Sequence, residues 1–148
     1  MSIPPFTASG DLPPGVHITS LNEAMERFGT PTARRKIVAA RLERIYRLAT
    51  ATGNLVRFVV FGSFVTAKPE PNDVDVFMLM EDSFDSSVLT GEARLLFDHG
   101  AADTFFGASV FWLRRLAAFG GEDATIEYWQ IKRDRGLRGI VEIVREEG

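Results

Sequence analysis

The motif Phe61-Gly62-Ser63, followed after nine residues by Asp73-Val74-Asp75-Val76, is the most informative feature of this 148-residue chain. The first motif ends the apolar, β-branched run 55–61, and the second begins another such run, 74–80. Runs of this length and composition are typical of β-strands. We therefore expect the two motifs to lie at the ends of two strands that the intervening loop joins.

The second motif carries two carboxylates, Asp73 and Asp75. Side chains alternate along a strand with a period of two, so both point to the same face, with their Cα atoms about 6.5–7 Å apart. Mg²⁺ prefers oxygen ligands and is commonly held by one or two carboxylates together with the phosphates of a nucleotide. The pair therefore predicts a site for Mg²⁺ or Mn²⁺ with a bound nucleoside triphosphate.

The first motif supplies groups that suit phosphate. Gly62 has no Cβ, so the backbone can approach a ligand closely, and Ser63 adds a hydroxyl and opens a turn whose N–H groups can face a phosphate. Pro69 and Pro71 limit any helix after Ser63 to one or two turns. Gly62 and Ser63 are predicted to bind phosphates, and Lys68 is expected either to reach a phosphate from the loop or to remain solvated.

These residues resemble the signature of the nucleotidyltransferase superfamily, which includes DNA polymerase β, kanamycin nucleotidyltransferase and the small antitoxin-type nucleotidyltransferases. The signature is a hydrophobic residue, Gly, Gly or Ser, a gap, and then acid-hydrophobic-acid-hydrophobic; the chain fits it from Phe61 to Val76. A second resemblance, carried by 12–17 and 138–143, is to a bacterial family of small single-domain members within this superfamily. The expected fold is α+β (α/β), a nucleotidyltransferase-like mixed β-sheet flanked by helices.

The resemblance implies metal-dependent transfer of a nucleoside monophosphate from ATP or another nucleoside triphosphate to a hydroxyl acceptor. Asp73 and Asp75 would hold one or two Mg²⁺ ions, and Gly62 and Ser63 would bind the β- and γ-phosphates. The acceptor hydroxyl would attack the α-phosphorus and pyrophosphate would leave. Because the chain is too short to contain a separate acceptor-recognition domain, a partner protein or an RNA is the expected acceptor.

A third acid on the next strand commonly completes the metal site in this superfamily. Asp103 is the candidate catalytic and metal-binding residue, and Glu127 and Glu142 are its rivals. Each stands in a segment that is expected to be a strand: 103–106, 125–131 and 139–144. A turn at 134–137 is predicted to join the last two segments in a C-terminal β-hairpin.

A competing interpretation is a non-catalytic binding protein with this fold, such as one half of a bacterial toxin–antitoxin pair. The small size of the chain favours this alternative. Phe64-Val65-Thr66 stands where antitoxin-type members often carry arginine, so phosphate clamping and acceptor choice do not follow from the resemblance. The retained pair Asp73 and Asp75 favours catalysis, because a pure scaffold has no chemical need for two carboxylates on one face beside Gly-Ser.

Composition predicts a single domain over residues 19–148, preceded by an extended, Pro- and Gly-rich arm at 1–18. No run of eighteen apolar residues is present and the start lacks the pattern of a signal peptide, so we expect a cytoplasmic protein that does not enter the membrane. A net charge of −3 argues against a general nucleic-acid binder. The basic clusters 34–36 and 132–138 are expected to be solvated.

Helical periodicity and caps predict the remaining elements. A helix is expected over 21–28, followed by a longer one that starts at Pro31 and ends before Gly53. Another is expected over 92–99. The segment 109–119 is predicted as a helix, with continuation of the preceding strand as the alternative.

Overall fold

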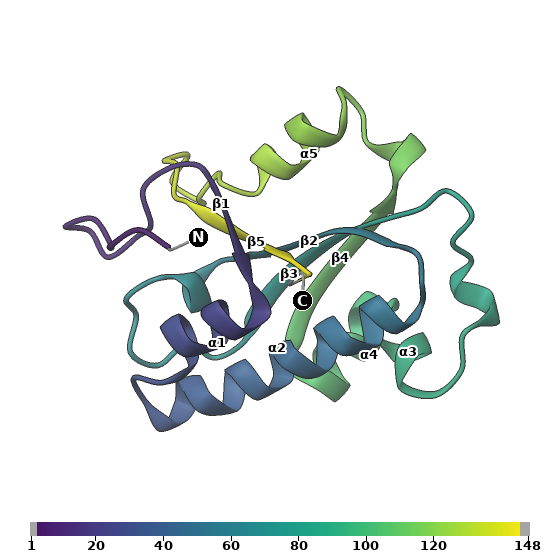
Figure 1. Cartoon of the computed structure of the whole chain (residues 1–148), viewed down its shortest axis with the longest axis horizontal. Helices are drawn as coiled ribbons and strands as arrows, with labels where there is room; N and C mark the ends of the chain where they lie inside the picture. Colours follow the sequence, from purple (N-terminus) through teal and green to yellow (C-terminus); the bar gives the residue numbers. More distant parts are fainter. Residues whose placement is uncertain (1–2, 146–148) are drawn as a thin grey trace.

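A five-stranded mixed sheet organises the computed structural model, which describes residues 3–145 (Figure 1). The strand order is β1-β5-β2-β3-β4, where β1 and β5 run parallel, as do β3 and β4, and β2 is antiparallel to both of its neighbours. This is the α+β class that the sequence predicts. The strands are β1 (Val16–Ser20), β2 (Leu55–Phe61), β3 (Val74–Met80), β4 (Ala108–Arg114) and β5 (Ile140–Val144).

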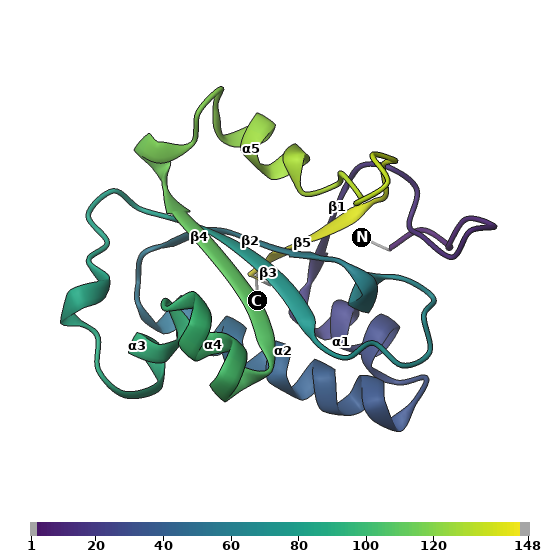
Figure 2. The same cartoon turned by 180° about the vertical axis from the view of Figure 1, so that it is seen from behind.

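Helices cover the two faces of the sheet unequally (Figures 1 and 2). Four of them pack on one face and α5 lies on the other. The helices are α1 (Leu21–Gly29), α2 (Ala33–Ala51), α3 (Gly91–Leu96), α4 (His99–Phe106) and α5 (Glu122–Tyr128), with short 3-10 turns η1 (Ser63–Val65), η2 (Ser86–Val88) and η3 (Arg115–Ala117). No helix within residues 3–145 is long and apolar enough to cross a membrane.

The core is divided by the sheet. The larger part lies between the sheet and α1–α4, where Phe58 and Met78 meet Leu42 of α2. The smaller part lies on the α5 face, where Val59 and Phe77 pack with the one buried side chain of α5. Because a single short helix covers this second face, part of β3 and β4 there is free to carry a site.

The two motif strands and the first two helices agree with the sequence predictions. The bounds of β2 and β3 coincide with the predicted runs, and α1 is capped by Ser20, whose Oγ accepts a hydrogen bond from Glu23 N at 3.1 Å. The predicted start of α2 at Pro31 is wrong by two residues. Thr32 is the N-cap, since its Oγ1 accepts from Arg35 N while also donating to Pro69 O in the motif loop.

The predicted helix over 92–99 is interrupted. Phe97 is buried in the core, and the Asp98 carboxylate accepts a hydrogen bond from Ala101 N, which starts α4. As a result α4 includes Asp103, and the strand predicted over 103–106 is wrong. A left-handed Gly107, with φ of 62°, ends this helix and turns the chain into β4.

The helix predicted over 109–119 is also wrong, and the alternative of a strand holds for its first half. Pairing with β3 fixes β4 as a strand, with Val110 and Trp112 facing α1–α4 and Leu113 facing α5. The segment 125–131 was predicted as a strand, which is wrong: 125–128 form the second half of α5, and 129–131 follow the helix. The C-terminal turn is present, but a single bridge between Ile131 and Leu137 closes it, and β5 pairs with β1 and β2.

The N-terminal segment contains no helix over residues 3–18, as expected for an extended arm. It is nevertheless part of the folded unit, because Ile3 and Leu12 are buried in the larger core and its end forms β1 beside β5.

Candidate functional site

The site is built on one row of residues across the sheet. Phe61 at the end of β2 lies directly opposite Asp75 of β3, and Asp75 lies opposite Ser109 of β4. Partners in register share a face, and Phe61 packs into the core under α5. Asp75 therefore stands on the sparsely covered α5 face, with Asp73 just before the start of its strand.

Gly62 allows the turn after β2 to pack against the carboxylate. Its backbone has φ of 79°, in a region that side chains disfavour. A Cβ at this position would lie 2.0 Å from Oδ2 and 3.0 Å from Cγ of Asp75. The space that glycine leaves open is therefore filled by the acid itself. Ser63 then begins η1, a helix of one turn as predicted, and its carbonyl accepts from Thr66 N at 3.2 Å.

Arg35 fixes the loop between the two motifs. The prediction that the basic cluster 34–36 is solvated is wrong for this residue, which is only 3% exposed. Burial lowers the pKa of its guanidinium. The guanidinium donates hydrogen bonds to the carbonyls of Phe28, Phe64, Thr66 and Lys68. These bonds hold the loop onto α2 and so bring Asp73 back toward the Gly62 turn.

The two acids perturb one another. Burial raises the pKa of Asp75 to about 6, and the nearby negative charge of Asp73 contributes to the increase. Ser109, Arg138 and Arg133 act in the opposite direction and lower this pKa. Two like charges are thus held close together, and one of them is partly desolvated. A divalent cation between the carboxylates would offset both their mutual repulsion and the desolvation of Asp75. The oxygen ligands suit Mg²⁺ or Mn²⁺.

Cationic side chains approach the acid pair from two directions. On one side, Arg34 and Arg41 of α2 donate to Asn72, the residue before Asp73, from their Nη1 atoms at 3.5 and 3.4 Å. On the other side, Arg133 and Arg138 in the C-terminal turn are close enough to influence Asp75. Arg34, Arg133 and Arg138 were expected from the sequence to be solvated, and no prediction was made for Arg41. These arginines place positive charge around the acid pair, where it could pair with the negative charge of a polyphosphate.

The structure does not bring the candidate third acids to this pair. Asp103 is exposed on α4, which packs on the opposite face of the sheet, so its prediction as a strand acid is wrong. Glu127 is exposed on α5. Glu142 is on β5 as predicted but is 6% exposed and accepts two hydrogen bonds from Arg57, at 3.0 and 2.7 Å. That ion pair already balances its charge.

Lys68 lies in the motif loop with its side chain exposed, while its carbonyl is held by Arg35. This position leaves both sequence interpretations of Lys68 open. The β4 position beside Asp75 is occupied by the hydroxyl residue Ser109.

Sequence reasoning missed the aromatic group next to the row. Trp129, which follows α5, lies with its ring centroid 4.6 Å from that of Phe61 and 5.2 Å from that of Phe111. Its role was hidden because 125–131 was expected to be a strand. Side chains alternate between the two faces of a strand, so Phe111 of β4 lies on the same face as Ser109. This alternation is the signal that could have revealed the aromatic group.

Asp75→Asn is expected to stabilise the protein at neutral pH in metal-free buffer. A carboxyl whose pKa rises from 3.8 to about 6 on folding contributes stability below pH 4 that is lost as the pH rises through 6. About 2 pH units correspond to about 3 kcal/mol, an upper bound for the gain. Urea unfolding at pH 4 and pH 7.5 measures it. A difference in unfolding free energy between variant and wild type that does not change with pH would contradict this account of Asp75.

The comparisons with known proteins place the chain in one family. Residues 4–144 match the family described as "Family of unknown function (DUF6932)", so the chain belongs to that family. No curated protein and no solved structure matches the chain.

Proposed function

We propose that this protein is a metal-dependent nucleotidyltransferase that moves a nucleoside monophosphate from a nucleoside triphosphate to a hydroxyl on a partner protein or an RNA, in the cytoplasm. The observation that supports the proposal most strongly is the Asp75 carboxylate, which is partly buried beside Asp73 and packed against the Gly62 turn. Maintaining two adjacent carboxylates there costs stability, as expected of a site whose charge serves binding.

In this proposal Asp73 and Asp75 would hold Mg²⁺ or Mn²⁺, and the cation would supply positive charge to the reacting phosphates. The turn at Gly62 and Ser63 orients the β- and γ-phosphates, and Arg133 and Arg138 offset their remaining charge. The acceptor oxygen forms a bond to the α-phosphorus while the bond from that phosphorus to the bridging oxygen breaks. Pyrophosphate leaves and the acceptor proton passes to solvent or a nearby base.

Transfer can be detected without knowing the acceptor. Incubation of the protein with α-³²P-labelled nucleoside triphosphates, Mg²⁺ or Mn²⁺ and cell extract should label a protein or RNA band. Asp75→Asn should reduce the label to background, because the variant loses a ligand of the cation. Asp103→Asn is the matched control, since it removes an exposed acid on the other face and should leave the label unchanged.

A second candidate function is a binding protein that retains this fold without catalysis, such as one half of a toxin–antitoxin pair. Ser109 favours it. A third acid on the strand next to the acid pair was expected to complete a catalytic metal site, and the β4 position beside Asp75 carries this hydroxyl residue instead. In that case no label is transferred, and wild type and Asp75→Asn bind or neutralise the partner equally well. This result would overturn the enzymatic proposal and support the binding protein.

A further inference from the structure

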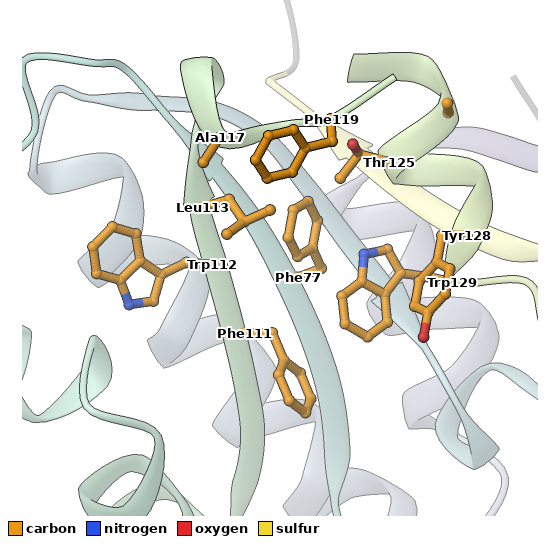
Figure 3. Close-up of a pocket in the computed structure, with 10 residues that line it drawn as sticks. Phe77, Phe111, Trp112, Leu113, Ala117, Phe119, Thr125, Tyr128 and Trp129 are labelled. Atoms are coloured by element: carbon orange, nitrogen blue, oxygen red, sulfur yellow. The ribbon is translucent and has the colours of Figure 1, made fainter. Parts of the chain in front are cut away.

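A cavity of about 480 Å³ opens between β4 and α5 on the same face of the sheet as Asp75 (Figure 3). Its volume is within the range of roughly 300–1,000 Å³ that is typical of small-molecule sites. Apolar and aromatic side chains dominate the lining. Those that matter most are Phe77, Phe111, Leu113, Ala117, Phe119 and Trp129.

Three aromatic side chains of the cavity, Phe77, Phe111 and Trp129, have similar orientations, whereas Tyr128 is nearly perpendicular to Trp129 at 84°. The indole plane of Trp129 makes angles of 30° with Phe77 and 34° with Phe111, and the ring centroids are 5.1 and 5.2 Å apart. Aromatic rings pair favourably in offset, nearly parallel arrangements as well as edge to face. A space bounded by such rings favours a flat aromatic molecule over a branched aliphatic one.

One polar atom beside this cavity is unsatisfied. The Nε1 atom of Trp129 is buried and has no hydrogen-bond partner among residues 3–145. Figure 3 shows this nitrogen on the edge of the indole that faces Phe77 and Thr125. The Thr125 hydroxyl donates to Gly121 O at 3.0 Å. Because a buried N–H without an acceptor costs free energy, a ligand that brings one acceptor to this edge would gain by satisfying it.

The mouth of the cavity carries large side chains in contact with water. Phe119 is 91% exposed and Tyr128 is 62% exposed. Exposed apolar side chains grouped beside a cavity indicate a surface that a ligand covers, unlike apolar residues scattered singly. The lining side chains carry no formal charge, so a charged ligand would lose its hydration without compensation.

We propose that this cavity binds a planar, uncharged aromatic small molecule that accepts one hydrogen bond from Trp129 Nε1. A purine or pyrimidine base fits less well, because its several donors and acceptors would be buried without partners. Phe77 is two residues beyond Asp75 on the same strand face, so the bound molecule would lie next to the acid pair. The proposal does not depend on nucleotidyl transfer.

Quinoline and naphthalene test the proposal, since they share a shape and only quinoline has an acceptor nitrogen. In ¹H–¹⁵N spectra of the full chain, each of the two tryptophans gives one indole signal, which Trp112→Phe assigns. Both probes should produce saturable shifts in β4 and α5. Quinoline should also move the Trp129 indole signal downfield and bind about five-fold tighter, the effect of one hydrogen bond.

A variant in which the cavity is filled is compared with a variant that carries the same substitution elsewhere. Ala117→Phe places a ring in the cavity and should abolish binding of both probes, whereas Ala51→Phe, at the exposed end of α2, should not affect it. The proposal is overturned if neither probe gives saturable shifts in wild type, or if the two probes bind equally well and leave the Trp129 signal in place. Shifts of the cavity residues with protein concentration alone would overturn it as well and indicate that a second copy covers this face. The comparison of quinoline with naphthalene uses wild type alone, so it tests the proposal even if Ala117→Phe does not fold.

Discussion

Gly62→Val is expected to destabilise the protein by more than about 3 kcal/mol or to prevent folding. Two effects combine. A β-branched residue at φ of 79° is strained, typically by about 1–3 kcal/mol. In addition, the new Cβ would lie 2.0 Å from Asp75 Oδ2, so either the turn or the acid must move. The variant should therefore lose metal–nucleotide binding together with stability.

Gly53→Val separates the two effects. Gly53 has a similar φ of 73°, but a Cβ there would meet nothing within 4 Å. Urea unfolding should show a smaller loss for Gly53→Val, attributable to strain alone. Combining Gly62→Val with Asp75→Gly should recover part of the difference, because the colliding carboxylate is removed. Equal losses for the two single variants, with no recovery in the double variant, would show that Gly62 serves only backbone geometry.

The strands around the motif could be predicted from the sequence because their signals are local. A β-branched run ending in Gly-Ser and another beginning with Asp-Val-Asp define β2 and β3, and the nearby prolines define the one-turn η1. The pair Asp73 and Asp75 follows from strand alternation alone. In the structure Asp73 lies just before the start of β3 and is close enough to raise the pKa of Asp75.

The other elements depend on pairing, capping and burial that the residue pattern alone does not reveal. The segment 109–119 has apolar residues compatible with either a helix or a strand, and only its pairing with β3 decides the outcome. The capping carboxylate of Asp98 and the buried Phe97 redirect the chain so that Asp103 falls on a helix. The third-acid prediction failed for this reason.

Buried charge was the hardest feature to predict. Arg35 stands in a run of three cations near a helix start, a pattern that usually indicates a solvated surface. Its burial depends on four carbonyl groups, three of which lie about thirty residues away in the motif loop. An unfavourable cation near a helix N-terminus was the only local signal.

The double variant Asp73→Asn, Asp75→Asn is expected to lose at least about a hundred-fold in affinity for a metal–nucleotide complex. Changes to groups that merely orient metal ligands cost roughly 10–100-fold, and removing the ligands themselves should cost more. The free energy of unfolding should not fall at neutral pH, since burial of Asp75 opposes its charge. The loss of affinity would thus not arise from misfolding.

Calorimetric titration of the folded protein with Mg²⁺ and a non-hydrolysable nucleoside triphosphate shows whether Asp73 and Asp75 form the metal–nucleotide site. Asp103→Asn, Glu127→Gln is the matched control, because it removes two exposed acids and changes the net charge equally. We expect wild type and this control to bind the complex with the same affinity, while Asp73→Asn, Asp75→Asn does not bind it measurably. Equal binding by all three proteins would show that the acid pair is not the metal–nucleotide site.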